Sequence, residues 1–197
     1  MINRRNILLG ATALSLTAAC ASTPGADAPT APTTYTAAAF FQTTAYAMSA
    51  PTGLSFSPDG RSILISNDSS GVFNAYALSI EGGAAVPLTA STTNATFAES
   101  YFPNDDRVIV TADQGGNELN HVYVRERDGT LRDLTPGDEL KADFLSWRND
   151  GAAFYVISNE RNPEVFDLYE YDATTYERRL VYENPGMEIS DLSPNGR

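Results

Sequence analysis

The 197-residue sequence is acidic, with 25 aspartates and glutamates against 13 lysines and arginines and a formal charge of −12. It contains no cluster of lysine and arginine, which argues against a nucleic-acid-binding protein, because such proteins usually carry a basic patch. Its single cysteine excludes a disulfide bond within the chain.

Residues 1–20 have the three parts of a secretory signal peptide. Arg4 and Arg5 form a short basic start, an apolar run extends from Ile7 to Ala19, and small residues precede Cys20. The apolar run is too short for a permanent membrane-spanning helix. The paired arginines resemble a twin-arginine export signal, and export by the Sec route stays open.

The segment before Cys20 reads LTAAC and resembles a bacterial lipobox. In this interpretation the thiol of Cys20 is lipidated and Cys20 becomes the new N-terminal residue. An exported protein gains little from one unpaired thiol, so a modification site explains this cysteine better than a free thiol does. We therefore predict a protein held on the periplasmic side of a bacterial membrane by acyl chains. The outer membrane is favoured because Ala21, not aspartate, follows the cysteine. The alternative is an ordinary signal peptide in which Cys20 is incidental.

Residues 21–50 are predicted to be a linker and lead-in. Ala21 to Thr34 is rich in Ala, Thr and Pro, and Asp27 is its one charged residue. Such a segment cannot bury enough apolar surface to offset the entropy of ordering, so we expect a flexible tether between the membrane and a folded domain. Thr36 to Thr43 is predicted to form one short helix.

A repeat of about 46 residues organises the rest of the chain, 51–197. Three independent markers share this period. The markers are a turn at Pro58, Pro103, Arg148 and Pro194, a tyrosine at 76, 123 and 169, and Leu88-Thr89 matched by Leu134-Thr135.

Each repeat divides into four short strands. Asp-Gly and Gly-Gly pairs between short apolar runs are strong hairpin signals, because tight turns need positive φ angles. The predicted strands are 53–57, 63–66, 74–80 and 85–88, then 96–102, 108–111, 121–127 and 130–134, then 143–147, 153–158, 167–172 and 176–182. The runs Val108–Val110 and Phe154–Ile157 are continuously apolar, as in strands buried on both faces.

Four antiparallel strands in each repeat of this length predict an all-β protein, a β-propeller of four-stranded blades. The predicted blades are 51–91, 92–137 and 138–186, and 187–197 matches the start of a further blade. Propellers usually have four to eight blades to close their open sheet edges. We therefore expect the sequence to be part of a longer protein.

The sequence offers no assembled catalytic or metal site. It has no G-x-S-x-G motif, and its one histidine, His121, occupies the repeat position shared with Asn74 and Asp167. We therefore interpret His121 as a polar residue at the start of a strand, and we predict no catalytic residue, no cofactor and no metal ligand. The acidic clusters Asp105-Asp106 and 113–118 lack the carboxylate spacing of a calcium loop, which favours solvated loops.

Several phrases of the sequence resemble a known family. The turns Ser57–Gly60 and Ser193–Gly196 resemble the propeller repeats shared by prolyl oligopeptidase-type serine peptidases and TolB-type periplasmic proteins. Longer phrases resemble the N-terminal propeller of the peptidases, namely GGNELNHVYVR at 115–125, LRDLTPG at 131–137, and ISNER at 157–161 with FDLY at 166–169. The resemblance covers about Phe40 to Arg197.

The resemblance implies a propeller that covers a C-terminal α/β-hydrolase domain and restricts which peptides reach it. No part of that domain lies in this sequence, so no catalytic residue is carried over. The expected function is thus the non-catalytic propeller of an exported serine peptidase acting on short peptides. One alternative is a TolB-type propeller that binds proteins as a scaffold, and another is a lipoprotein enzyme with a site in its own channel.

Overall fold

The computed structural model describes residues 33–193, so the predicted signal peptide, Cys20 and most of the linker lie outside the described residues. The chain divides into two units, 1–41 and 42–197. In the described part of the first unit, Ala37–Phe40 form the short helix α1, and the Thr36 side chain caps it by accepting a hydrogen bond from the Ala39 N–H. The predicted short helix is confirmed, over fewer residues. Within residues 33–193 no helix combines the length and the hydropathy needed to span a membrane.

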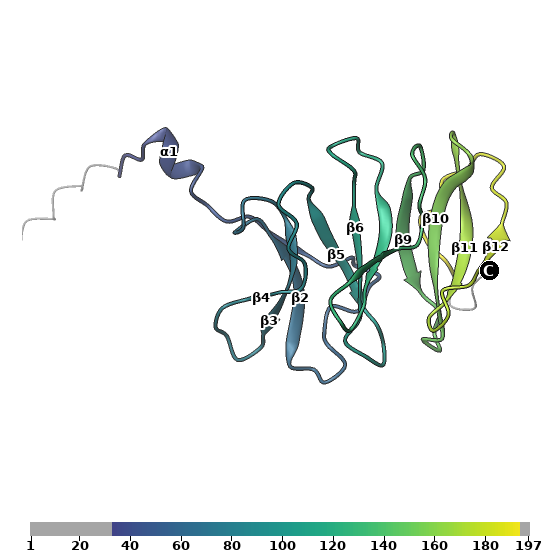
Figure 1. The fold of residues 1–197 in the computed structure, drawn as a ribbon, viewed down its shortest axis with the longest axis horizontal. Helices are drawn as coiled ribbons and strands as arrows, with labels where there is room; N and C mark the ends of the chain where they lie inside the picture. The colour runs from purple at the N-terminus through teal and green to yellow at the C-terminus, as the bar shows by residue number, and fades with distance from the viewer. Residues whose placement is uncertain (1–32, 194–197) are drawn as a thin grey trace, which may run out of the picture. The chain divides into compact units, whose positions relative to one another are not determined.

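The second unit contains three four-stranded antiparallel sheets, which follow one another along the chain (Figure 1). In each sheet every strand pairs with its neighbour in sequence. The first sheet comprises β1 (Tyr46–Met48), β2 (Ser62–Asn67), β3 (Asn74–Ser79) and β4 (Val86–Pro87). The second comprises β5 (Thr96–Tyr101), β6 (Val108–Ala112), β7 (His121–Arg125) and β8 (Leu131–Asp133). The third comprises β9 (Ala142–Trp147), β10 (Ala153–Asn162), β11 (Val165–Asp172) and β12 (Arg178–Tyr182).

Every strand predicted in the second and third repeats is present, but the first strand of the first repeat is not where the sequence placed it. The segment 53–57 makes only one isolated bridge, Phe56 to Ile63. The first strand of this sheet is instead β1, which lies earlier in the chain, within the segment 21–50 expected to be linker and lead-in. β1 pairs with β2.

The backbone between β1 and Phe56 explains this difference. Pro51 cannot donate to a ladder, and the chain turns there toward the second sheet. The Ala50 N–H donates to the Glu99 carbonyl at 3.0 Å, and the Leu54 carbonyl accepts from the Tyr101 N–H at 2.9 Å. A Cβ at Gly53 would lie 2.1 Å from the Glu99 carbonyl oxygen, so only glycine permits this approach.

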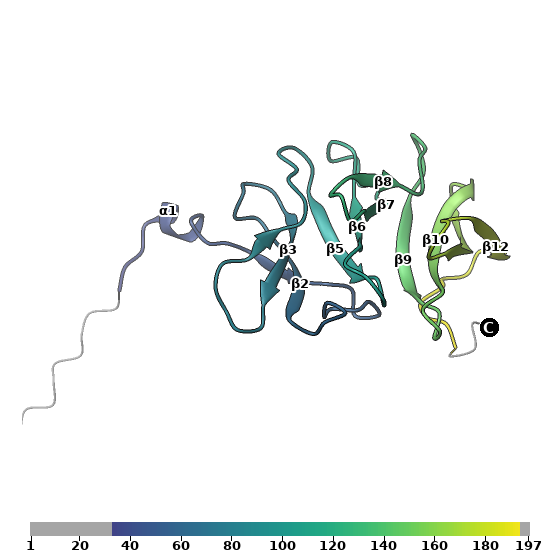
Figure 2. The same cartoon turned by 60° about the horizontal axis from the view of Figure 1, so that its bottom comes forward.

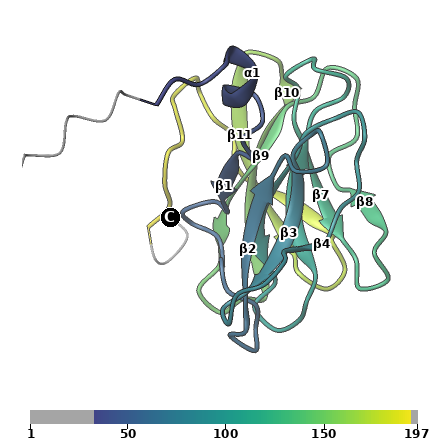
Figure 3. The same ribbon diagram turned by 90° about the vertical axis from the view of Figure 1, so that its left-hand side faces the viewer.

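The middle strands alternate their side chains between two neighbouring sheets. Val108 and Val110 belong to the same core cluster as Leu64 of the first sheet, while Ile109 between them belongs to the cluster that contains Phe154 of the third sheet. Figure 2 shows β5 between β2 and β9, and Figure 3 views the second unit at right angles to Figure 1, with the sheets overlapping. Two packed faces on one sheet explain why this run is continuously apolar.

The last described segment packs without forming a strand. Glu188 to Leu192 was expected to resemble the first strand of a further blade, and it makes no strand pairing among residues 33–193. Ile189 and Leu192 pack instead against Leu168 and neighbouring apolar side chains on the outer face of the third sheet.

Candidate functional site

Three polar side chains occupy the same register position in the three sheets. Asn74 and His121 are the first residues of β3 and β7, Asp167 is the third residue of β11, and all three pair with the second strand of their sheet. All three residues are buried, at 0% or 1% exposure. The repeat position that the sequence assigned to His121 is thereby confirmed. We call these residues the strand-start residues.

Asn74 joins two segments of the first sheet through its amide. Its Oδ1 accepts hydrogen bonds from the Thr89 hydroxyl at 2.9 Å and the Ser91 N–H at 2.7 Å. Its Nδ2 donates to the Ser70 hydroxyl at 3.0 Å and to the Ser91 carbonyl at 2.9 Å. The residue therefore ties the loop between the second and third strands to the segment that leaves the fourth strand. We call this arrangement a clamp: a buried strand-start residue, the loop before it and the segment after the fourth strand, joined by hydrogen bonds.

His121 forms the clamp of the second sheet. Its Nδ1 lies 2.8 Å from Asp133 Oδ2 and 3.3 Å from Gln114 Nε2. Its Nε2 lies 3.0 Å from the Gly137 carbonyl oxygen, in the segment after β8. The ring also stacks on Tyr123, with centroids 6.1 Å apart. Because both ring nitrogens face protein partners and the ring is buried, the geometry does not suit a general base for an external substrate.

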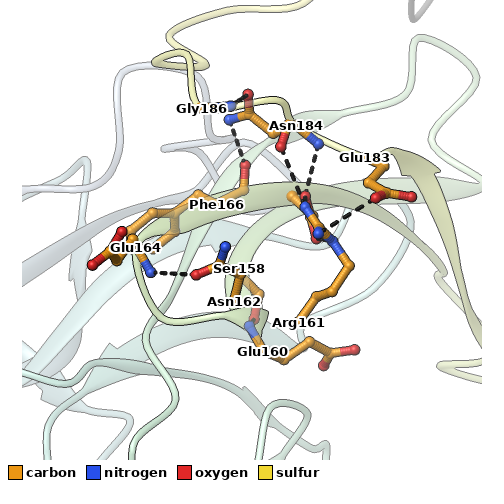
Figure 4. Close-up of polar contacts among 10 residues, drawn as sticks. Ser158, Glu160, Arg161, Asn162, Glu164, Phe166, Glu183, Asn184 and Gly186 are labelled. Carbon is orange, nitrogen blue, oxygen red and sulfur yellow. Dashed lines mark hydrogen bonds and ion pairs between the residues drawn. The ribbon is translucent and has the colours of Figure 1, made fainter.

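The clamp of the third sheet is ionic. The Asp167 carboxylate accepts from Arg161 Nε at 2.5 Å and Nη2 at 2.9 Å, and from the Asn184 N–H at 2.7 Å. Figure 4 shows Arg161 between Glu183 and Asn184, and Asn184 turned toward Phe166 and Gly186. The hydrogen bonds from Arg161 hold the pKa of Asp167 below its usual value.

Asn184 extends the ionic clamp into the chain that follows β12. Its Oδ1 accepts from the Gly186 N–H at 3.0 Å and the Met187 N–H at 2.8 Å. Its Nδ2 donates to the Phe166 carbonyl at 2.9 Å. A buried amide with this many partners fixes the path of the chain as it leaves the third sheet.

The Leu-Thr marker of the sequence also belongs to the clamps. The Thr89 hydroxyl accepts from the Ala75 N–H, and the Thr135 hydroxyl accepts from the Val122 N–H, both at 2.9 Å. Each threonine thereby satisfies a buried amide one residue after the strand-start residue.

Two partly buried carboxylates lie on the first strands of neighbouring sheets. Glu99, the extra residue of a β-bulge in β5, accepts from the Thr111 hydroxyl at 2.5 Å. Burial raises the pKa of Glu99, and the nearby charge of Asp143 on β9 raises it further. Burial also raises the pKa of Asp143, opposed by Lys141 and by a hydrogen bond from Asn120. Both carboxylates thus lie on strands at the edges of their sheets, where burial favours their neutral forms.

The two acidic loops are held by internal contacts. Asp105 bonds to Arg107 Nε at 2.8 Å and pairs with Arg127 at 2.9 Å. In the loop 113–118, Asp113 Oδ2 accepts from the Glu118 N–H at 3.3 Å. Within the described part of the chain, no three His, Cys, Asp or Glu side chains are grouped to hold a metal ion.

An apolar cleft of about 490 Å³ lies on the outer face of the third sheet. Leu168, Val181 and Tyr182 line one side, and residues 188–192 line the other. The loop 113–118 contributes Gln114 to the clamp of the second sheet, whereas Asp105-Asp106 and the residues that line this cleft take no part in the clamp contacts.

Several residues of the site were missed from the sequence. The partners Gln114, Arg161 and Asn184 were not singled out, and they lie seven residues before His121, six before Asp167 and 17 after Asp167, respectively. The one shared offset is that of Ser91 and Asn184, which each lie 17 residues after a strand-start residue and donate their N–H to it. The carboxylates Glu99 and Asp143 carry no repeat signal, because the matching positions differ in type.

Comparison with known proteins gives structural matches only. No family model matches the sequence, and no curated protein matches it. TolB from Acinetobacter baumannii is 17% identical with a TM-score of 0.55, over 77% of this chain and 36% of that one. Oligogalacturonate lyase from Vibrio parahaemolyticus is 19% identical with a TM-score of 0.51, over 71% of this chain and 41% of that one. A prolyl endopeptidase is 17% identical with a TM-score of 0.51, over 65% of this chain and 21% of that one.

The sheets are propeller blades. Three four-stranded antiparallel sheets, repeated in register and similar to these solved propeller proteins, confirm the all-β fold class predicted from the sequence. The matched proteins differ in activity, so this structural similarity supports the shared fold and gives no evidence for a particular function. The chain spans less than half of each protein named here.

Proposed function

We propose that this chain is the non-catalytic propeller part of an exported serine peptidase. In this proposal the blades restrict access of short peptides to an α/β-hydrolase domain that is not part of these 197 residues. The phrases at 115–125, 131–137 and 157–161 support the assignment by their resemblance to the peptidase propeller. A prolyl endopeptidase among the structural matches is compatible with it.

One observation carries the non-catalytic role. His121 is the only histidine of the chain, and both of its ring nitrogens are held by the clamp of the second sheet. A Ser–His–acid triad needs an imidazole that can take a proton from the nucleophile. In this proposal the His121 imidazole has a structural role, and the catalytic groups come from the α/β-hydrolase domain.

The proposed location follows from the N-terminal sequence. Cys20 carries lipid in this proposal, the tether 21–34 follows it, and the protein is bound to the periplasmic side of a bacterial membrane, with the outer membrane favoured. The acidic charge of the chain does not favour docking on anionic lipid, so the acyl chains supply the attachment.

The test is labelling of the natural gene product by a serine-reactive fluorophosphonate probe. The product is captured from cells with an antibody against residues 51–193, and a catalytically inert propeller protein captured in the same way is the control. The proposal expects a labelled polypeptide longer than 197 residues. An unlabelled product would contradict it and would favour the TolB-type scaffold, in which the propeller binds proteins and no enzyme is attached.

A further inference from the structure

A second cleft, of about 390 Å³, is formed where the first and second sheets meet. Turns of both sheets contribute to it, since Asp59 comes from the turn before β2 and Asp105 and Asp106 come from the turn before β6. Tyr101, the last residue of β5, and Arg125, the last residue of β7, also line it. We call this hollow the inter-sheet cleft. Its volume is in the range of small-molecule sites, about 300–1,000 Å³.

The Tyr101 hydroxyl is the unusual group of the inter-sheet cleft. Tyr101 is only 3% exposed, yet its hydroxyl has no hydrogen-bond partner among residues 33–193. Within this range no fully buried polar side-chain atom lacks a partner, so the hydroxyl reaches the open space of the cleft. At the matching position of the third sheet, the Trp147 indole N–H donates to the Ser100 hydroxyl at 2.8 Å. The partner of the Tyr101 hydroxyl must therefore come from outside the described chain, as water or as a ligand.

The carboxylates of the cleft have unused capacity to accept hydrogen bonds. Asp59 Oδ1 accepts from the Ser57 hydroxyl at 2.6 Å and from the Arg61 N–H at 3.0 Å, and neither contact uses Oδ2. The hydrogen bond from Ser57 holds the pKa of Asp59 below its usual value, so this carboxylate is ionised at neutral pH. The Asp106 side chain is 71% exposed, and its ion pair with Arg127 is long at 3.7 Å.

Arg125 brings the opposite charge to the same cleft. Its Nε donates to the Leu88 carbonyl at 3.2 Å, and it forms no ion pair with an acidic residue of the described range. Asp105 is instead paired with Arg107 at 2.8 Å and with Arg127 at 2.9 Å. The inter-sheet cleft thus presents charges of both signs that do not pair with each other.

Charges of both signs act at the Tyr101 hydroxyl. Burial raises the pKa of Tyr101, the charges of Asp59 and Asp106 raise it further, and the charge of Arg125 lowers it. The hydroxyl therefore lies near all three charged groups. The wall beside them is apolar and consists of Pro58, Ala77 and Leu88.

We propose that the inter-sheet cleft binds a small zwitterion, a free amino acid with an apolar side chain. The ammonium group of the ligand donates to Asp59 and Asp106, and its carboxylate accepts from Arg125. The Tyr101 hydroxyl accepts from the first group or donates to the second, and the apolar wall accommodates the side chain. A ligand with only one charge also meets the like charge of the cleft, which disfavours it. This inference does not depend on the proposed peptidase function.

The test uses three probes that share one branched hydrocarbon skeleton. L-Leucine carries both charges, 4-methylpentanoate lacks the ammonium group, and 3-methylbutylamine lacks the carboxylate. Each is titrated into the nitrogen-15-labelled 197-residue chain, and the NMR signals of Arg125 Nε and of the Arg61 and Arg107 amides report binding. We expect leucine to bind about tenfold more tightly than either single-charge probe, as for the gain of one hydrogen bond to a charged group. Equal binding of the three probes, or no binding of leucine, would overturn the proposal.

Three variants and a matched control locate the binding in this cleft. Tyr101→Phe keeps the ring in the core and removes a hydroxyl without a protein partner, so it should fold normally and bind leucine about tenfold more weakly. Arg125→Gln should abolish the preference for leucine over 3-methylbutylamine, and Asp59→Asn should reduce the preference for leucine over 4-methylpentanoate. Asp150→Asn is the control, because Asp150 lies in the matching turn of the third sheet and accepts from the Ala152 N–H at 3.0 Å. It should bind leucine like wild type. Leucine binding that is unchanged in Tyr101→Phe and in Arg125→Gln would also overturn the proposal.

Discussion

The Tyr176 hydroxyl of the third sheet accepts a hydrogen bond from Arg107 Nη1 of the second sheet at 2.6 Å. Tyr176 holds a left-handed backbone, with φ at 60°, in the turn between β11 and β12. The Arg132 guanidinium lies 4.8 Å from the centre of its ring. Left-handed conformations are unfavourable for bulky residues, so contacts with the neighbouring blade support this turn.

Removing the Tyr176 hydroxyl should weaken the junction of these two blades. We expect Tyr176→Phe to lower the free energy of unfolding by about 1 kcal/mol, because it removes a hydrogen bond to a charged group while keeping the ring. Urea unfolding measures the change. Tyr182→Phe is the matched control at a more exposed site, with an expected change within about 0.5 kcal/mol. Equal losses in the two variants would show that the contact with Arg107 contributes nothing.

The ionic clamp of the third sheet should contribute more to the free energy of unfolding than the Tyr176 hydroxyl does. Asp167→Asn should cost about 2 kcal/mol, less than the loss of a fully buried ion pair, because the Arg161 side chain is 36% exposed. The pKa of Asp167 is lowered in the folded state, so its contribution is present above the ordinary value of 3.8 and is lost as the pH falls through the folded value. The difference between wild type and variant should therefore shrink in strong acid. Glu164→Gln, on the same hairpin and exposed, is the control. A loss that is independent of pH would contradict the ionic account.

The contribution of Glu99 to stability should depend on pH in the opposite direction to that of Asp167. Its pKa is raised in the folded state above the ordinary value of 4.5, so the contribution of Glu99 to stability is greatest below that value and is lost as the pH rises through the folded value. Glu99→Gln keeps an acceptor for the Thr111 hydroxyl and removes the charge. We expect the variant to unfold at a higher urea concentration than wild type at pH 7 and at the same concentration at pH 4. A variant less stable than wild type at pH 7 would refute this assignment.

The repeat pattern predicted the strand-start residues because it reflects backbone register, which recurs in every blade. It could not predict the contact between Arg107 and Tyr176, since these residues are 69 positions apart and meet only when two blades dock. The first strand was misplaced for a related reason. Pro51 and Gly53 redirect the chain to the Glu99 carbonyl of the next sheet, and no local signal reports that partner.

The lipid proposal has a direct test at Cys20. Metabolic labelling with a fatty acid should mark the wild-type protein and should be lost in Cys20→Ser, because the proposed acyl attachment requires the thiol. Ser22→Ala, two residues further on, is the control and should be labelled like wild type. Equal labelling of wild type and Cys20→Ser would exclude this cysteine as the lipid site.

Peptide hydrolysis by the natural gene product tests the central proposal most directly. The product captured through residues 51–193 and the purified 197-residue chain are assayed side by side on chromogenic aminoacyl and prolyl peptides of increasing length. We expect the captured product to cleave short peptides and to lose activity on longer ones, and the 197-residue chain to cleave none. The proposal would be contradicted by a captured product that cleaves nothing. Cleavage by the 197-residue chain that His121→Ala abolishes would contradict it equally.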